Sequence, residues 1–474
     1  MTYQNFVAGR WVDGEEILAV EDPATGETVA EAPLAGERTL ARALEAARRS
    51  ADRGDLAAMV PQARADLMRR IAREIRAVAE EGATLLTRES GKRLSDARGE
   101  FEEAAAYFDY YGGLADKIEG KHIPLGPDYV DYTVCEPMGV SAQIVPWNFP
   151  VSIAARSLAP ALASGNAVIV KSPELDPLGL IVLARALESA GVPEGAVSIL
   201  NGIGGDLGAK LVASPRIDQI VFTGSVPTGQ AILRAAADNV TPTLMELGGK
   251  SAAVAFEDAD LDTLLHSVRS GIFFNAGQVC SAMSRLLVQR RLYDRAVEAC
   301  AELARSLKAG HGLDEAEHTP VISARQLDSV EALVGTARDD GATIAAGGRR
   351  LDRPGHFMAP TILSDVDPKA RVAREEIFGP VLCMTPFDTE DEAVRMANGT
   401  EFGLVAGIFT RDLARAHRVA SRLRAGQVFV NEWFAGGIAT PFGGVGKSGF
   451  GREKGVEALY NYVRTKNIAI SLKG

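Results

Sequence analysis

The chain has 474 residues, which is too many for one ordinary hydrophobic core and predicts two or three domains. Its formal net charge of −11 argues against a nucleic-acid or anionic-membrane partner. No apolar run approaches the length of a membrane span, and the first residues resemble neither a signal peptide nor a transit peptide. We therefore expect a cytoplasmic protein that does not bind membranes.

The cysteines lie far apart in the sequence, and no two of them form a CxxC pair. They are Cys135, Cys280, Cys300 and Cys383. This spacing indicates neither a zinc site nor a disulfide framework. We therefore predict no metal, and each thiol is free either to pack or to do chemistry.

Helices and strands follow a regular order in the first half of the chain. Residues 39–52 and 64–80 are predicted as amphipathic helices. From about residue 141, strands are predicted at 141–146, 166–172, 196–200, 219–225 and 242–249, and helices at 151–165, 177–191, 205–213 and 228–238. Strands that alternate with helices are typical of a parallel, doubly wound sheet, so the fold class is α/β.

The second half repeats this pattern more loosely and predicts a second α/β domain. Helices are expected near 259–274, 292–308, 324–340 and 412–424, and strands at 285–289, 342–348 and 427–432. Residues 129–140 and the tail 467–472 are also expected to be extended. Because an exposed strand at a chain end invites aggregation, pairing with a neighbouring subunit is one solution.

Polar or glycine-rich groups follow four of the strands predicted in the first half. They are Asn148, Lys171 with Glu174, Thr223 to Ser225, and Glu246. Ligands bind beyond the carboxyl ends of parallel strands, so these groups predict a cofactor cleft. The segment "NGIGGDLG" (201–208) is also rich in glycine, but we interpret it as a turn.

Cys280 lies in "FNAGQVCSA" among small or polar neighbours. A free cysteine is most often a small buried hydrophobe, which suits Cys300 and Cys383. An exposed loop thiol can instead be a nucleophile when its surroundings favour the thiolate. The stretch alone leaves both interpretations open.

Glu246 and Asn148 are the other two candidates for chemistry. Glu246, at a strand tip before two glycines, is either a general base with a raised pKa or part of an ion pair with Lys250. Asn148 lies between the two prolines of "PWNFP". A rigidly held amide there could donate to a developing oxyanion, although asparagine is also common in turns.

Taken together, these segments resemble the aldehyde dehydrogenase superfamily over nearly the whole chain. The motifs are, in order, "NFVAGRWV", "PWNFP", "FTGS", "ELGGKS", "GQVC", "EEIFGPV" and "PFGGVGKSGFGRE". The set is specific in this order and spacing. The resemblance implies a cofactor domain (1–118 and 141–248), a catalytic domain (249–448) and a small β arm (119–140 and 449–474). The arm would drive assembly of a homodimer or homotetramer.

The resemblance also implies roles for individual residues. Cys280 matches the nucleophile, Glu246 the general base and Asn148 the oxyanion donor. The cofactor residues implied are Lys171, Glu174, Gly224, Ser225, Trp147, Leu247, Glu376, Phe378 and Gln326. The substrate residues implied are Arg156, Phe149 and Phe442.

The implied reaction is oxidation of an aldehyde to a carboxylic acid through a cysteine thiohemiacetal and thioester. Glu246 would activate water for hydrolysis, which argues against relatives that pass the acyl group to coenzyme A. A carboxylate near the ribose 2′-hydroxyl repels a 2′-phosphate, so Glu174 favours NAD, although Lys171 could tolerate NADP. A cysteine esterase would not need the nicotinamide residues. A non-catalytic protein would be expected to lose one of the three reactive side chains.

The substrate is the least constrained prediction. Arg156, eight residues after Asn148, resembles an arginine of semialdehyde dehydrogenases and would pair with a substrate carboxylate, as in succinic semialdehyde. Alternatively, Arg156 is bonded to its own protein. Trp433 and Phe434 could stack on a neutral aromatic aldehyde. In contrast, the glycines that follow them in the sequence indicate a wider substrate pocket.

Overall fold

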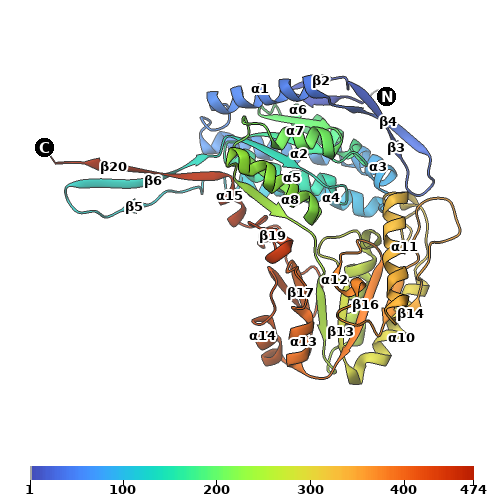
Figure 1. Cartoon of the computed structure of the whole chain (residues 1–474). Coiled ribbons are helices and arrows are strands. Elements are labelled where there is room, and N and C mark those ends of the chain that lie inside the picture. Colours follow the sequence, from blue (N-terminus) through green and yellow to red (C-terminus); the bar gives the residue numbers. More distant parts are fainter. Residues whose placement is uncertain (1–2, 474) are drawn as a thin grey trace.

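The computed structural model describes residues 3–473. Two α/β bodies lie one above the other, and a long ribbon projects from the upper body (Figure 1). Within the described residues, no helix has both the length and the apolar character needed to cross a membrane.

The upper body is built on an eight-stranded sheet. Its order is β19 (Gly449–Phe450), β11 (Thr243–Glu246), β10 (Gln219–Thr223), β7 (Val140–Ile144), β8 (Ala167–Ser172), β9 (Val197–Asn201), β1 (Asn5–Val7) and β2 (Arg10–Val12). The five strands from β11 to β9 are parallel, whereas β1, β2 and β19 are antiparallel. The predicted doubly wound sheet is therefore confirmed.

Helices cover both faces of this sheet, and each face has its own apolar core. One face carries α2 (Pro61–Ala77), α3 (Ala79–Ser90), α4 (Leu94–Gly112), α5 (Pro150–Ala163) and α6 (Leu178–Ser189). The other carries α1 (Glu37–Arg53), α7 (Ala209–Val212) and α8 (Val226–Asn239). A short ribbon of β3 (Glu16–Glu21) and β4 (Thr28–Leu34) lies at the edge. Because both faces are covered, every residue of β8, β9 and β10 is buried.

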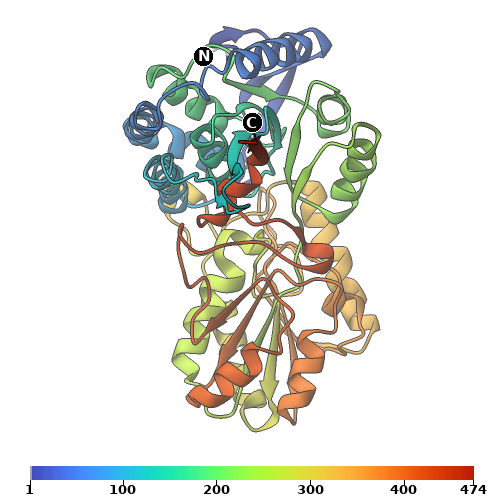
Figure 2. The ribbon, with the colours of Figure 1, turned by 90° about the vertical axis from the view of Figure 1, so that its left-hand side faces the viewer.

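The lower body has a seven-stranded sheet, seen from the side in Figure 2. Its order is β14 (Thr343–Ala346), β15 (Thr361–Ser364), β16 (Val381–Phe387), β13 (Arg285–Gln289), β12 (Ala252–Ala255), β17 (Val405–Phe409) and β18 (Gln427–Val430). All neighbours are parallel except β14 and β15. Its helices are α9 (Leu261–Val268), α10 (Arg290–Ser306), α11 (Ala324–Asp339), α12 (Arg371–Arg374), α13 (Glu390–Ala397) and α14 (Leu413–Ala420).

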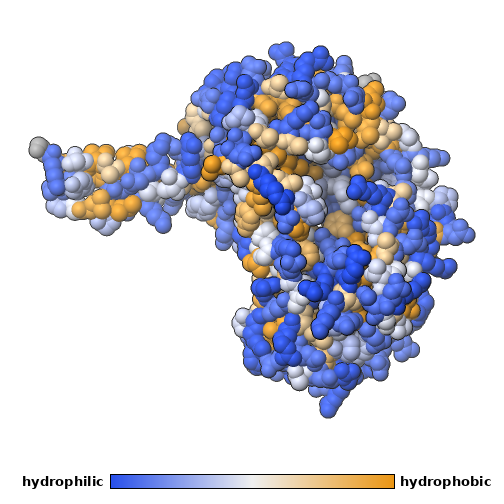
Figure 3. Space-filling view, viewed as in Figure 1, coloured by the Kyte–Doolittle hydropathy of each residue, from blue (hydrophilic) through white to orange (hydrophobic). Residues whose placement is uncertain are grey.

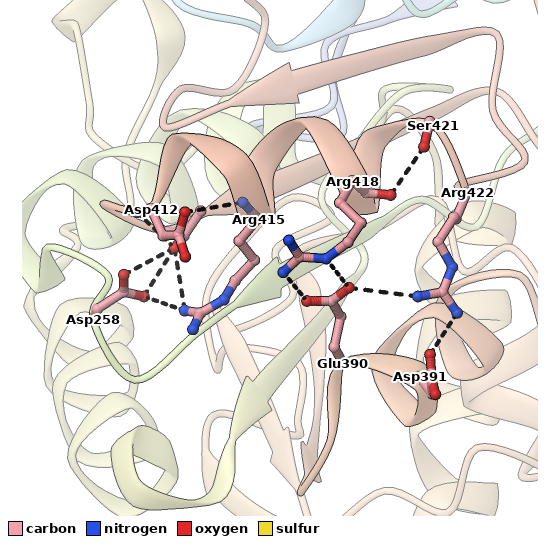
Figure 4. A network of polar contacts seen from close by, with 9 residues as sticks. Asp258, Glu390, Asp391, Asp412, Arg415, Arg418, Ser421 and Arg422 are labelled. Carbon is pink, nitrogen blue, oxygen red and sulfur yellow. Dashed lines mark hydrogen bonds and ion pairs between the residues drawn. The ribbon is translucent and has the colours of Figure 1, made fainter.

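Ion pairs join α13 to α14 on the surface of the lower body (Figure 4). Arg418 and Arg422 both reach Glu390, at 2.8 and 3.4 Å, and Arg415 reaches Asp258 at 3.0 Å. Exposed pairs contribute about 0–1 kcal/mol each, so this network orients the two helices more than it stabilises the fold.

The projecting ribbon consists of β5 (His122–Ile123), β6 (Tyr129–Pro137) and β20 (Val463–Ser471). The two extended segments predicted from sequence thus pair with each other, antiparallel, within one chain. Val130, Ile470 and Leu472 are exposed on it, and Figure 3 shows hydrophobic residues along the ribbon. The short helix α15 (Glu457–Asn461) precedes β20. We keep the three-part division as a proposal, with β19 assigned to the upper sheet, because it pairs with β11 there.

Candidate active site

A groove of about 1130 Å³ lies beyond the carboxyl ends of the upper strands. Loops that follow β7, β8, β10 and β11 form one side, and segments around residues 280, 322–329 and 376–378 form the other. Every catalytic and cofactor residue predicted from sequence lines this groove. They are Asn148, Glu246, Cys280, Trp147, Lys171, Glu174, Gly224, Ser225, Leu247, Gln326, Glu376 and Phe378. The fold therefore brings together side chains from distant parts of the sequence.

Cys280 is partly buried in a loop whose backbone is unusual. The preceding turn has left-handed φ values of 47° at Asn275, 51° at Ala276 and 73° at Gly277. A Cβ on Gly277 would lie 2.1 Å from the carbonyl oxygen of Gly379, so only glycine fits there. This close approach joins the Cys280 loop to the segment that carries Glu376 and Phe378.

The thiol of Cys280 is neutral in the absence of a ligand. Burial raises its pKa to about 11, and the negative charges of Glu376 and Glu246 raise it as well. The Arg156 guanidinium opposes this shift and lowers the pKa. The thiolate is therefore a minor species at neutral pH, and added positive charge in the groove increases its population.

Asn148 is held by contacts on both its backbone and its side chain. Its Nδ2 donates to the carbonyl oxygen of Gln278 at 3.0 Å, and the residue is 4% exposed. A side-chain amide has two N–H groups, so this bond leaves one donor free. Gln278 in turn donates to Asn275 and accepts from the N–H of Ile322. The Asn148 amide is therefore fixed against the loop that carries Cys280.

Glu246 is buried at the tip of β11, and neither of its carboxylate oxygens has a hydrogen-bond partner among the described residues. Burial raises its pKa well above the usual value, and the charge of Glu453 adds to the shift. A Cβ on Gly443 would lie 2.7 Å from Oε1, so this glycine leaves room for the carboxyl group. A raised pKa makes the carboxylate form of Glu246 a stronger base toward water.

The alternative role for Glu246, an ion pair with Lys250, is not found in the structure. The Nζ of Lys250 is buried and, like the Glu246 oxygens, has no hydrogen-bond partner in residues 3–473. Burial lowers the pKa of Lys250, and nearby charges from Cys383 and Glu376 raise it.

Glu376 and Phe378 lie opposite the strand ends. The Oε1 of Glu376 accepts the N–H of Gly249 at 2.9 Å, and burial raises the pKa of this carboxyl to about 7. Phe378 has a left-handed φ of 55° and packs edge to face on Trp147, with ring centroids 5.2 Å apart. Gln326 donates to the carbonyl oxygen of Phe378 at 2.8 Å, so it holds this segment in place.

Lys171 and Glu174 form an ion pair of 2.6 Å at the other end of the groove. Gly204 faces them, because a Cβ there would lie 3.7 Å from the Lys171 Nζ. Ser225 is the N-cap of α8 and accepts the N–H of Thr228, and Gly224 donates its N–H to the carbonyl oxygen of Glu246 at 3.0 Å. This end of the groove therefore carries the charged side chains of Lys171 and Glu174 beside Gly204.

Comparison with known proteins places the chain in a family. The family model described as "Aldehyde dehydrogenase family" matches residues 11–468. The chain belongs to the aldehyde dehydrogenase family. It is 40% identical to a betaine aldehyde dehydrogenase of Cereibacter sphaeroides over 472 residues, which cover 99% of this chain and 97% of the relative.

Solved aldehyde dehydrogenase structures have the same fold. The NAD⁺ complex of an aldehyde dehydrogenase from Bacillus cereus is 37% identical and has a TM-score of 0.98, with 100% of this chain and 97% of the other covered. A betaine aldehyde dehydrogenase from Staphylococcus aureus in complex with NAD⁺ is 35% identical with a TM-score of 0.98, covering 100% of this chain and 95% of the other. The predicted family, the α/β fold class and the NAD(P)-dependent enzyme class are confirmed.

The groove of this aldehyde dehydrogenase fits a nicotinamide dinucleotide. The Lys171–Glu174 pair is suited to ribose hydroxyls, and the glycine at position 204 leaves space beside it. At the other end, Glu376 keeps one carboxylate oxygen beyond its bond to Gly249, on the side where Cys280 lies. The groove thus includes both the Lys171–Glu174 pair and the Cys280 thiol.

Arg156 contacts its own protein. Its guanidinium is ion-paired with Glu453, and both side chains are buried, at 8% and 1% exposure. The guanidinium carbon also lies 5.4 Å from the ring centroid of Phe442. This arrangement agrees with the second alternative given for Arg156, in which the arginine bonds to its own protein. The positive charge of Arg156 is balanced by Glu453.

Aromatic side chains pack against the same apolar core as Cys280 in this aldehyde dehydrogenase. Phe149 stacks on Phe274 with centroids 5.7 Å apart, and Phe274 packs edge to face on Phe434 at 6.5 Å. These rings, with Phe442 and Cys280, are partly buried against one apolar core. Trp433 is buried and donates to the carbonyl oxygen of Ser281, so it braces the loop.

Sequence reasoning missed two parts of the site. The glycine-rich segment interpreted as a turn forms a π-helical turn, Gly204–Gly208, and Gly204, Gly205 and Gly208 line the groove. The adjacent glycines were the available signal. Lys92 and Glu453 carried no signal because the residues that they contact near the groove, Asn148 and Arg156, lie far away from them in the sequence.

Proposed function

We propose that this enzyme oxidises an uncharged aldehyde to its carboxylic acid with NAD⁺, through a thioester on Cys280 that water then hydrolyses. The observation that carries the proposal is one groove in which Cys280, Asn148 and Glu246 lie with the residues suited to a dinucleotide.

The first step uses the thiol and the amide. The Cys280 thiol first gives its proton to water. The thiolate sulfur then bonds to the aldehyde carbon as the C=O π bond opens, and the carbonyl oxygen becomes an oxyanion. The free N–H of the Asn148 side chain and the backbone N–H of Cys280 stabilise that charge, because preorganised donors are most effective where charge develops. The bond from Asn148 to Gln278 restrains the amide plane for this task.

The second half of the reaction uses the carboxyl group. When bound, the nicotinamide accepts the hydride that leaves the aldehyde carbon. The thioester that remains on Cys280 is hydrolysed by water, whose proton passes to Glu246. A buried carboxyl without partners and with a raised pKa is suited to this proton transfer. Its presence supports hydrolysis over transfer of the acyl group to coenzyme A.

Charge balance supports an uncharged substrate. Each cation near the phenylalanine rings has a protein partner: Arg156 pairs with Glu453, Lys92 with Glu100, and Lys454 with Glu103. A substrate carboxylate would have to compete with a buried glutamate for Arg156, and a cationic substrate would meet these cations. Apolar or aromatic aldehydes gain instead from burial against the rings.

A panel of aldehydes tests this substrate preference. We expect kcat/KM to be highest for hexanal or phenylacetaldehyde, and at least about tenfold lower for succinic semialdehyde and for betaine aldehyde, since one charge without a partner in such a site costs more than about 1.4 kcal/mol. Arg156→Met should lower kcat/KM for all of them by similar factors. A selective loss on succinic semialdehyde would instead establish Arg156 as a substrate carboxylate ligand.

Glu174 supports NAD as the preferred cofactor. A carboxylate beside the ribose repels the 2′-phosphate of NADP. We expect kcat/KM at least about tenfold higher with NAD⁺ than with NADP⁺, and a smaller ratio in Glu174→Gln. Glu401→Gln, which also loses an exposed ion-paired carboxylate, is the control. Steady-state kinetics in which the unaltered enzyme prefers NADP⁺ would contradict the proposal.

We also propose that the enzyme assembles as a homodimer or homotetramer through the ribbon of β5, β6 and β20. Its exposed apolar residues Val130, Ile470 and Leu472 would be buried against another copy. Two long strands, β6 and β20, with only the two-residue strand β5 beside them form a marginally stable ribbon alone, which also supports such packing.

A further inference from the structure

Lys92 is a buried cation directly behind the Asn148 loop. It lies between α3 and α4 and is 1% exposed. Its Nζ donates to the Oε1 of Glu100 at 2.5 Å and to the backbone carbonyl oxygen of Asn148 at 2.9 Å. A buried ammonium thus bonds to the peptide of the residue that carries the oxyanion-binding amide.

Glu100 extends this contact to the helix that follows Asn148. Its Oε2 accepts the N–H of Val151 at 2.8 Å and of Ser152 at 3.1 Å, in the first turn of α5. A carboxylate at a helix N-terminus satisfies donors that the helix leaves free. The Lys92–Glu100 pair therefore clamps the segment that carries Asn148 at its carbonyl and at the helix after it.

The same clamp reaches the catalytic loop and the aromatic wall. Asn275, five residues before Cys280, donates its Nδ2 to the same Asn148 carbonyl at 3.1 Å. The Lys92 Nζ lies 4.6 Å from the ring centroid of Phe149, and this ring stacks on Phe274. Lys92 thus contacts both the peptide that orients the amide and the ring beside it.

We propose that Lys92 is a positioning residue for the oxidation, which fixes the Asn148 peptide so that the free side-chain N–H faces the developing oxyanion. This inference rests on the proposed function, since it assigns Lys92 a role through Asn148. The peptide carbonyl receives two donors, and the side chain of the same residue is bonded to Gln278, so the amide has little freedom to turn. Loss of the ammonium frees the peptide plane and misplaces the donor.

The decisive experiment is a double-mutant cycle on kcat. We expect Lys92→Met to lower kcat by about 10- to 100-fold with little change in the KM for NAD⁺, because small misplacements of an orienting group have effects of this size. Asn148→Ala should lower kcat by about 10²- to 10³-fold. Adding Lys92→Met to Asn148→Ala should have no further effect, because the donor that Lys92 positions is already absent.

Two further variants separate positioning from stability. Lys92→Met leaves Glu100 as an unpaired buried charge, so the double variant Lys92→Met/Glu100→Gln removes both charges, and its kcat should fall by the same factor. Arg64→Met is the matched control. Arg64 is also a buried cation that donates to backbone carbonyls, those of Leu56 and Ala57, but it lies outside the groove. It should lower the melting temperature without lowering kcat.

A third measurement, the rate of Cys280 alkylation, tests the thiol separately from the stabilisation of the oxyanion. Alkylation of Cys280 by iodoacetamide needs no oxyanion donor, so its rate should be unchanged in Lys92→Met. The inference is overturned if Lys92→Met folds and keeps a kcat within about twofold of the unaltered enzyme, or if it lowers kcat equally in the Asn148→Ala background. An unaltered enzyme that reduces no NAD⁺ with any aldehyde would contradict the proposed function itself, not the role of Lys92.

Discussion

Replacing Cys280 with alanine is expected to lower kcat by at least about 10⁴-fold, because no other group can form the covalent intermediate. Among the described residues, Cys280 is the cysteine that lines the groove, whereas Cys300 and Cys383 are buried in apolar cores and Cys135 lies on the ribbon. The measurement is formation of reduced nicotinamide, by absorbance, with a neutral aldehyde. Fluorescence titration should show that the variant still binds NAD⁺.

Cys135→Ser is the control for this variant, since its thiol is partly exposed but lies on the ribbon, and it should leave kcat unchanged. Activity that survives Cys280→Ala but not a change at another cysteine would refute the assignment. The raised pKa of Cys280 adds a second signature. Below a pKa of about 11 the thiolate fraction grows about tenfold per pH unit, so alkylation without cofactor should accelerate steeply from neutral to alkaline pH.

The upper sheet could be predicted because its strands are buried on both faces. Residues 167–172 and 219–223 have apolar centres, Ala-Val-Ile-Val and Ile-Val-Phe, lie between helices of clear period, and are buried throughout. The strands of the lower sheet were harder to predict from the sequence. β12 consists of Ala252–Ala255, and β17 and β15 are also short; alanine has little preference for strands, so β12 becomes one by packing between β13 and β17.

Helix ends were predicted less well than helices. The helix expected over 259–274 ends as an α-helix at Val268, and a π-helical turn takes the chain to Phe273. The left-handed residues Asn275 and Ala276 follow at once, and Gly277 after them packs closely on Gly379 and Pro380, a contact that no local pattern reveals. The conformation of the loop that carries Cys280 therefore depends on tertiary packing.

Many of the residues that line the groove could be predicted from the sequence, whereas the ion pairs that hold them could not. Asn148, Lys171 and Glu246 stand at ends of parallel strands, and topology alone collects such ends at one edge. The ion pair of Arg156 with Glu453 joins α5 to the C-terminal region. Nothing local distinguishes an arginine that binds substrate from one that meets a distant glutamate.

Replacing Glu246 with glutamine is expected to separate oxidation from hydrolysis. The change keeps the shape of the side chain but removes its ability to take a proton from water, so turnover should fall by about 10²- to 10⁴-fold. Formation of the thioester needs Cys280 and Asn148, not a base that acts on water. Rapid mixing with NAD⁺ and a neutral aldehyde should therefore give a burst of reduced nicotinamide, close to one equivalent per site, followed by a slow steady rate.

Mass spectrometry of the quenched Glu246→Gln variant should show the acyl group on Cys280, and added hydroxylamine should speed its release. Glu103→Gln is the matched control: Glu103 lies near Arg156 and Lys454 but bonds to Ser152, and its exchange should leave hydrolysis fast. If Glu246→Gln shows no burst because the first turnover slows as much as the later ones, the carboxyl activates the Cys280 thiol before the aldehyde reacts. In that case its raised pKa serves the sulfur, not the water.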